Sequence, residues 1–226
     1  ATDAELENLI TVSENCQSLN EFLQCFELPG KYMQTEIGIR EAVKLVLANM
    51  AAGGVVYAEI RFAPQLHTFR GLTQEEVIQA ALAGLKEASI PANLILCCMR
   101  GDDNAAQNKE TVELAKKYLV ADGGVVAVDL AGAEALFPNE GFRELLQAAH
   151  EAGIPLTIHS GEAGGPENVE SAIEMGALRV GHGVRIAGNE RIMQLVKEKG
   201  ITLEMAPTSN RQTKTVVDMK TEYPLS

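Results

Sequence analysis

Two histidines and a glutamate occupy glycine-rich turns that each follow a short apolar run. His159 and Glu162 lie in Pro155-Leu-Thr-Ile-His-Ser-Gly-Glu-Ala-Gly-Gly-Pro166, and His182 lies in Arg179-Val-Gly-His-Gly-Val184. A divalent metal held by imidazole lowers the pKa of a bound water to about 7, and a neighbouring carboxyl or imidazole can then move protons. These residues predict a metal-assisted hydrolysis, for which the sequence shows one or two of the usual three or four metal ligands.

Apolar strand-like runs alternate with amphipathic helical runs, and this alternation must position the three residues. Strands are predicted at 55–62, 93–99, 125–130, 155–158, 179–181 and 201–205. Two helices are predicted between 19 and 50, separated at Pro29-Gly30, and others at 73–88, 108–118, 141–152, 167–175 and 190–199. Such alternation is typical of a parallel sheet that is buried on both faces. Polar groups at the carboxyl ends of its strands would then form one site.

Six β/α units can form an open sheet or part of a closed barrel. No Gly-x-Gly-x-x-Gly turn follows the first predicted strand, and polar residues end several successive strands, so a barrel is favoured. A complete (β/α)₈ barrel typically needs about 250 residues, and this chain has 226. We therefore predict an α/β protein, a TIM barrel with about six of its eight β/α units, forming a single domain over residues 1–226.

Four motifs occur in the order typical of the adenosine deaminase family. They are Asp129-Leu-Ala-Gly132, the loop from His159 to Pro166, Gly181-His-Gly183 and Pro207-Thr-Ser-Asn210. With the strand Val55–Pro64, the resemblance covers nearly the whole chain. It implies a TIM barrel of the metal-dependent hydrolase type with one zinc ion. It also implies hydrolysis of a C–N bond in a cyclic amidine, converting adenosine or deoxyadenosine to inosine or deoxyinosine and ammonia.

The resemblance implies a role for each matching residue. His159 would be a zinc ligand, Glu162 would protonate a purine ring nitrogen, and His182 would orient or deprotonate the zinc-bound water. The backbone N–H of Gly132 would hold another purine nitrogen, where a Cβ would obstruct the base. The resemblance also extends to an apolar helix that, in the family, covers the substrate pocket. The matching residues here are Leu19, Phe22, Leu23 and Phe26. Without the resemblance, the spacing of these four is equally typical of core packing.

Two parts of the family pattern have no counterpart in the sequence. Nothing before Leu19 resembles the His-x-His pair of the family's first strand, and the Asp-Asp pair of its last strand has no match before Ser226. Three explanations are open: these residues belong to a longer chain, the protein is a true fragment, or a completing chain supplies the missing strands. One zinc ion is expected per complete chain, and two questions stay open for these residues alone: whether they bind zinc and whether they are active.

Two other functions remain open, and the composition of the sequence limits which classes of partner the protein can bind. The alternatives are a deaminase of adenine or another purine derivative, and a non-catalytic remnant that binds a nucleoside or a protein. A net charge of −12 without clustered Lys and Arg excludes nucleic acid as a partner. A small purine nucleoside is compatible with that charge. No apolar run reaches the roughly 18 residues that a membrane-spanning helix requires.

The cysteines and the remaining histidines are assigned no part in the chemistry. The four cysteines have no CxxC spacing, so reduced thiols and a cytoplasmic location are predicted. They are Cys16, Cys25, Cys97 and Cys98. His67 is expected to form a local hydrogen bond, and His150 to lie on the surface near a helix end.

Overall fold

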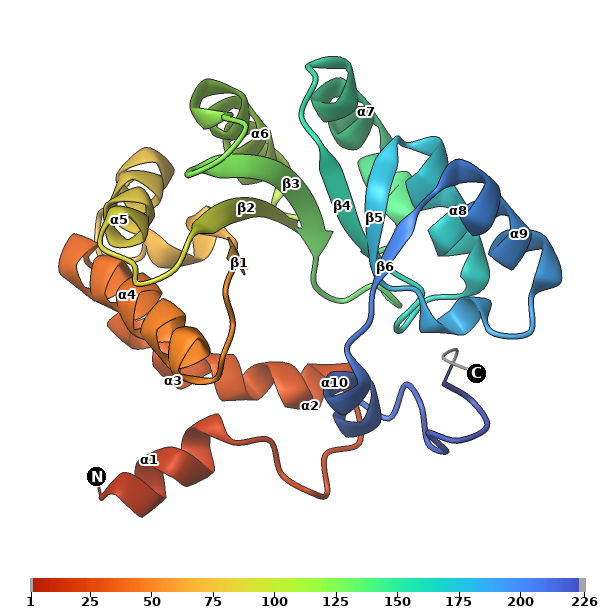
Figure 1. Ribbon diagram of the computed structural model, residues 1–226, viewed down its shortest axis with the longest axis horizontal. Helices are drawn as coiled ribbons and strands as arrows, with labels where there is room; N and C mark the ends of the chain where they lie inside the picture. The colour runs from red at the N-terminus through yellow and green to blue at the C-terminus, as the bar shows by residue number, and fades with distance from the viewer. Residues whose placement is uncertain (1, 224–226) are drawn as a thin grey trace. The chain divides into compact units, whose positions relative to one another are not determined.

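A computed structural model describes residues 2–223 (Figure 1). The chain divides into two compact units, each assembled from segments that are distant in sequence. Unit 1 comprises Ala1–Pro29, Ala131–Gln147 and Leu156–Ser226, and unit 2 comprises Gly30–Leu130 and Ala148–Pro155. Both units are built from β/α repeats, so the predicted alternation of strands and helices is confirmed.

Unit 2 contains the first three strands and the helices that connect them. The strands are β1 (Ala58–Phe62), β2 (Ala92–Met99) and β3 (Val125–Ala131), and β1 pairs in parallel with β2. Helices α5 (Gln74–Lys86) and α6 (Ala105–Tyr118) pack on β2, which is buried along nearly its whole length. An almost uniformly apolar strand is what a sheet covered by helices requires. Thr73 and Glu76 form a capping box that starts α5, as their spacing indicates.

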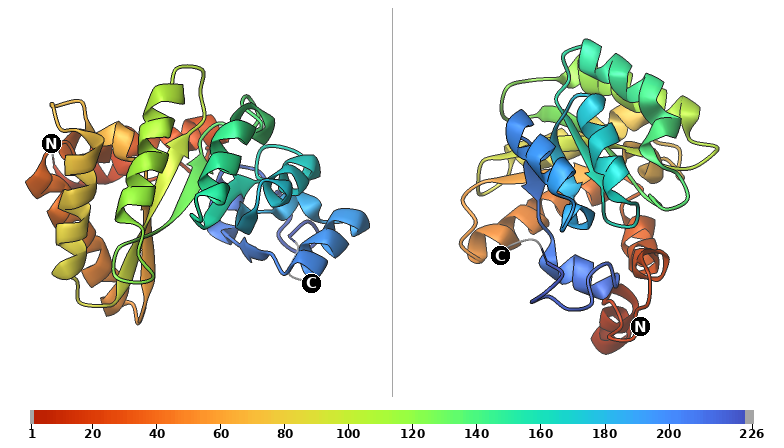
Figure 2. Two further views of the ribbon diagram at one scale, coloured as in Figure 1. Left: turned by 90° about the horizontal axis from the view of Figure 1, so that it is seen from above. Right: turned by 90° about the vertical axis from the view of Figure 1, so that its right-hand side faces the viewer.

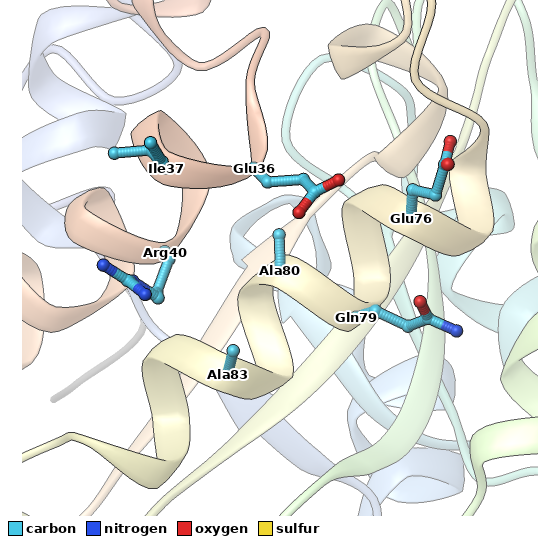
Figure 3. Close-up of a pocket in the computed structure, with 7 residues that line it drawn as sticks. All are labelled: Glu36, Ile37, Arg40, Glu76, Gln79, Ala80 and Ala83. Atoms are coloured by element: carbon cyan, nitrogen blue, oxygen red, sulfur yellow. The ribbon is translucent and has the colours of Figure 1, made fainter.

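Helix α4 (Glu36–Ala52) lies beside α5 (Figure 3). Gly84 permits this close approach, because a Cβ there would lie 2.7 Å from the carbonyl oxygen of Arg40. The surface pocket between the two helices is lined by Glu36, Ile37, Arg40, Glu76, Gln79, Ala80 and Ala83. None of the residues predicted to take part in the chemistry lines it.

Two local predictions in this region are wrong. The first strand begins at Ala58 rather than at Val55, and the side chains of Val55, Val56 and Tyr57 are exposed. Their apolar character alone suggested a strand, but they make no strand pairing. Pro29-Gly30 does not separate two helices, because both residues lie inside α3 (Glu27–Tyr32). Proline is tolerated there because the first turn of a helix has no intrahelical partner for its N–H groups.

Unit 1 contains the last three strands and the helices around them (Figure 2). Strand β4 (Leu156–Ser160) pairs in parallel with β5 (Ala177–His182), and β5 pairs in parallel with β6 (Thr202–Glu204). Helix α8 (Pro166–Glu174) connects β4 to β5, and α9 (Glu190–Lys199) connects β5 to β6. Parallel pairing brings the carboxyl ends of β4 and β5 together, where His159 lies opposite Gly181 and Ser160 opposite His182.

Short helices complete unit 1. The N-terminal segment forms α1 (Asp3–Ile10), α2 (Leu19–Leu23) and the 3₁₀ turn η1 (Gln24–Phe26). After β6 the chain forms α10 (Pro207–Gln212), and a small apolar cluster of Val184, Val216 and Tyr223 holds the following segment. Helix α7 (Arg143–Glu151) carries residues of both units. Within the described part of the chain, none of the helices has the length and hydropathy that a membrane span requires.

Candidate active site

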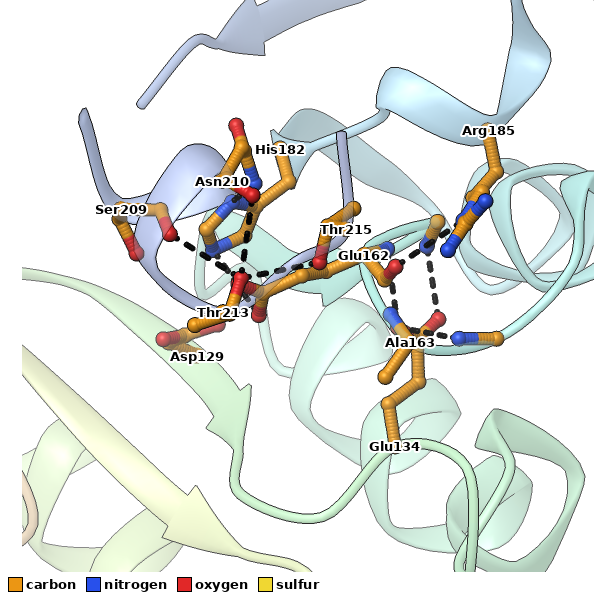
Figure 4. Close-up of polar contacts among 12 residues, drawn as sticks. Asp129, Glu134, Glu162, Ala163, His182, Arg185, Ser209, Asn210, Thr213 and Thr215 are labelled. Atoms are coloured by element: carbon orange, nitrogen blue, oxygen red, sulfur yellow. Dashed lines mark hydrogen bonds and ion pairs between the residues drawn. The ribbon is translucent and has the colours of Figure 1, made fainter. Parts of the chain in front are cut away.

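The structure brings three of the predicted site residues together in unit 1. His159 and His182 come from neighbouring strands, and their ring centroids are 5.3 Å apart. Nε2 of His182 lies 3.3 Å from Oε2 of Glu162, whose turn directly follows β4 (Figure 4). Glu162 and His182 are both buried. The grouping arises because parallel register places the end of β4 beside the end of β5.

The backbone at His182 adopts an uncommon conformation. His182 has φ 68°, and Gly183 after it also has φ 68°. A left-handed non-glycine residue costs about 1–2 kcal/mol and persists only where surrounding contacts determine it. One such contact is the side-chain amide nitrogen of Asn210, which lies 2.9 Å from Nδ1 of His182. The strained turn thus directs Nε2 toward Glu162.

The Glu162 carboxyl lies in a setting that favours its protonated form. Burial raises the pKa of Glu162, and the negative charge of Glu134 adds to that rise. The electrostatic interaction with His159 and a hydrogen bond from Thr213 act in the opposite direction. Thr213 Oγ1 lies 3.4 Å from Oε1 of Glu162 and 3.0 Å from the hydroxyl of Thr215. A carboxyl with a raised pKa can carry a proton at a pH where an ordinary glutamate has lost it, as a general acid must.

Glu134 is a buried residue of the site that the sequence analysis did not identify. Its carboxylate accepts hydrogen bonds from four consecutive backbone N–H groups, those of residues 161–164, at 2.7 to 3.0 Å. The side-chain amide of Asn168 donates to the same carboxylate at 3.0 Å. Glu134 follows Asp129-Leu-Ala-Gly132 by two residues, and an acidic residue just after a strand end was the available signal.

A second set of hydrogen bonds supports the same turn. The amide nitrogen of Asn139 donates to Oγ of Ser160 at 2.9 Å and to the carbonyl oxygen of Asn168 at 2.7 Å. In addition, Nε of Arg185 donates to the carbonyl oxygen of Glu162 at 3.3 Å. Fully satisfied buried polar networks hold a backbone in one conformation. The turn that carries Glu162 is therefore held from several elements.

The other predicted substrate-binding residues lie elsewhere in unit 1. Gly132 has φ 112°, a conformation that favours glycine, in the turn after β3. Leu19, Phe22 and Leu23 lie on α2, and Phe26 ends η1 with its ring centroid 5.7 Å from that of Phe22. None of the four is buried, and Phe26 is 58% exposed. The core-packing interpretation of these apolar residues is therefore wrong.

His159 offers one imidazole for a metal ion. Among residues 2–223, no group of three or more His, Cys, Asp and Glu side chains is arranged to hold a metal. The described residues can contribute to a zinc site but do not complete one, since zinc in proteins uses about three or four protein ligands.

In unit 2, strand β3 carries a second polar cluster. Asp129 is completely buried, Nε of Arg61 lies 3.5 Å from its carboxylate, and Sγ of Cys97 lies at the same distance. A buried carboxylate is costly unless it is paired. Arg61 from β1 thus supports the aspartate of the Asp129–Gly132 motif.

Solved structures share this fold. The chain superposes with a TM-score of 0.82 on an adenine deaminase from Arthrobacter aurescens, with 26% identity, covering 98% of this chain and 67% of the other. An amidohydrolase from Burkholderia ambifaria, described with bound Zn, gives a TM-score of 0.81 at 23% identity, covering 92% and 58%. These likenesses show the class of fold: residues 2–223 form six β/α units of a (β/α) barrel.

Sequence relatives specify the family. The sequence model of adenosine deaminase matches residues 1–226. An adenosine deaminase from Haemophilus ducreyi is 48% identical over 231 residues, covering 100% of this chain and 67% of the relative. The chain belongs to the adenosine deaminase family, and the resemblance seen in the sequence is confirmed. It spans about two thirds of the length of the curated relatives that it matches.

Proposed function

We propose that the protein catalyses the hydrolytic deamination of adenosine or deoxyadenosine to inosine or deoxyinosine and ammonia. The observation that carries this proposal is the buried contact between His182 and Glu162, in which Glu162 has a raised pKa and His159 lies alongside. The relative that is 48% identical, an adenosine deaminase, supports the same reaction.

Glu162 acts as the general acid in this proposal. Its protonated carboxyl donates to a nitrogen of the purine ring, which makes the adjacent carbon that bears the amino group more electrophilic. His182 orients or deprotonates the attacking water, with its ring held at Nδ1 by Asn210. The backbone N–H of Gly132 binds a second purine nitrogen, and the absence of a Cβ leaves room for the base.

His159 contributes one ligand to a zinc ion in the proposed active site. When bound, zinc lowers the pKa of a water molecule and so supplies hydroxide near neutral pH. The further ligands would come from parts of the protein outside the described residues or from a completing chain. Zinc content per chain and intact mass, compared with 24.2 kDa for these 226 residues, distinguish the two sources.

The four apolar residues of α2 and η1 cover the bound purine in this proposal. Leu23 and Phe26 are exposed, so they are available to contact a ligand. Covering the site would exclude water from the general acid and strengthen its electrostatic contacts. The other two residues of the set are Leu19 and Phe22.

Adenosine is preferred over adenine as the substrate. The adenine deaminase from Arthrobacter aurescens shares the fold at 26% identity, whereas the adenosine deaminase relative is 48% identical. Adenosine is therefore the first substrate to test, with adenine as the comparison.

The test is conversion of adenosine by the purified chain with zinc. The reaction is monitored by the fall in absorbance as inosine forms. Glu162→Gln is the matched control because it keeps the shape of the side chain and removes the acidic proton. Activity that depends on Glu162 supports the proposal. A folded protein that remains inactive with zinc bound contradicts it, and an inactive zinc-free sample supports the non-catalytic alternative for this chain.

A further inference from the structure

Glu134 makes an unusually dense set of contacts for one carboxylate. Oε1 accepts from the N–H of Gly161 and from the side-chain amide of Asn168, and Oε2 accepts from the N–H groups of Glu162, Ala163 and Gly164. Glu134 is only 2% exposed. Four of the five donors to this buried carboxylate therefore belong to one short turn, and the fifth is the side chain of Asn168 on α8.

The turn held in this way carries Glu162. The Glu134 carboxylate bonds the N–H of Glu162 itself and those of both its neighbours, so it determines where the Glu162 side chain leaves the backbone (Figure 4). That side chain ends 3.3 Å from Nε2 of His182. A shift of the turn would change this distance directly, because Glu162 belongs to the turn and its own N–H is one of the amides bound by Glu134.

Two glycines in the turn fit closely against their surroundings. A Cβ on Gly164 would lie 2.7 Å from Oε1 of Glu134, and Gly161 has φ 69°, where glycine is favoured. The glycines of this turn are therefore explained by the close approach of the Glu134 carboxylate, as well as by access for a ligand.

We propose that Glu134 is a positioning residue for the proposed deamination, holding the 161–164 turn so that the Glu162 carboxyl stays beside His182. The inference rests on the proposed function for its chemical meaning. Its structural content, the contact between Glu162 and His182, can be tested without any activity. Glu134 touches neither purine nor water in this proposal and acts only through Glu162.

Glu134→Gln tests this role with little change in side-chain shape. In either orientation of the glutamine amide, its NH₂ group replaces one carboxylate oxygen. At least two N–H donors then face this NH₂ group and lose their acceptor. Loss of these bonds is expected to speed hydrogen exchange of the 161–164 amides by about 10-fold or more. The resonance of Nε2 of His182 is expected to shift, since the nearby carboxyl moves. Glu144→Gln is the matched control, because Glu144 is exposed on α7.

The spectroscopic result separates positioning from general support of the fold. A variant that remains folded, with faster exchange at 161–164 and a shifted His182 signal, supports the proposal. Where the protein is active, Glu134→Gln should lower kcat by about 10-fold or more with a smaller change in KM, since proton transfer is the step affected. An unchanged His182 signal in a folded variant overturns the proposal, whether or not the wild-type chain deaminates adenosine.

A measurement on the unmodified chain covers the case in which the variant does not fold. The N–H groups of residues 162–164 should exchange slowly in the wild-type protein, because each is bonded to the same buried carboxylate. Exchange of these amides at the rate of an unstructured peptide would overturn the proposal by itself. Glu134→Asp, which keeps the carboxylate but shortens the reach, should give an intermediate exchange rate.

Discussion

His182 and Glu162 face each other at 3.3 Å, from Nε2 to Oε2, although the two residues lie on different turns. With the amide nitrogen of Asn210 donating to Nδ1, a neutral His182 ring carries its proton on Nε2, on the side of Glu162. A ring in this tautomer donates a hydrogen bond toward the carboxyl and cannot accept a proton at that nitrogen. In the proposed mechanism, this tautomer suits the orienting role of His182 and not the deprotonation of water.

Glu162→Gln should abolish most activity without loss of stability. General acid–base groups contribute about 10²- to 10⁴-fold to rate, so a fall of that size is expected in adenosine turnover. The raised pKa of Glu162 means that its contribution to stability is present below the usual pKa of 4.5 and is lost as the pH rises through the folded value. At pH 7 the neutral amide should therefore leave the thermal unfolding midpoint unchanged or higher. Undiminished turnover would refute the acid role.

Two substitutions at His182 should separate catalysis from backbone strain. His182→Asn and His182→Ala both remove the imidazole, and each should lower turnover by about 100-fold or more. Asparagine tolerates the left-handed backbone better than alanine, so His182→Asn should be the more stable by roughly 1 kcal/mol. Denaturant unfolding of both variants measures this difference. Equal stability would show that the φ of 68° is not maintained in solution.

Gly164→Ala should destabilise the protein because the site has no room for a methyl group. The added carbon would contact the side chains of Asn168 and Glu134, and displacing a buried network of this kind costs about 1–3 kcal/mol. Gly141→Ala is the control, since nothing lies within 4 Å of a Cβ at that position. Chemical unfolding should show a lower midpoint for Gly164→Ala alone, and equal midpoints would contradict the packing described here.

One thiol should react in the native state ahead of the others. Cys25 is partly exposed, whereas Cys16, Cys97 and Cys98 are buried. Burial, with the nearby charge of Asp129, raises the pKa of both Cys97 and Cys98, so little reactive thiolate is present. Labelling with a thiol reagent should modify Cys25 first and the remainder only on unfolding. Cys25→Ser should remove the fast phase, and a fast phase that persists would disagree with the structure.

His67 should make the stability of unit 2 depend on pH. Burial lowers the pKa of His67 below its usual 6.5, and Nδ1 donates to the carbonyl oxygen of Met33 at 2.7 Å. His67 therefore contributes fully to the stability of the folded state above pH 6.5. This contribution is lost as the pH falls through the lowered pKa that His67 has in the folded protein. The unfolding midpoint should fall from pH 7 to pH 5, less so in His67→Gln. His150→Gln, at an exposed position on α7, should behave as the wild type does.

The sequence by itself determined the alternation of strands and helices, the ends of most strands, and the family. Apolar periodicity is a local property, so β2 and α5 lie close to their predicted ranges. His159, Glu162 and His182 were recognisable because glycines and strand ends mark them in the chain itself. His67 bonds a backbone carbonyl, though one that is distant in sequence rather than local, and His150 is exposed, as predicted. The cytoplasmic location and the roles of the site residues stay predictions.

Only the tertiary structure decided which residues surround Glu162 and His182. Glu134 lies 28 positions before Glu162, and Asn210 lies 28 positions after His182, so no periodic pattern links them. Each contact depends on the path of a turn, and that path depends on which distant acceptor satisfies its buried N–H groups. The left-handed backbone of His182 has the same origin, because local preference opposes it and surrounding contacts maintain it.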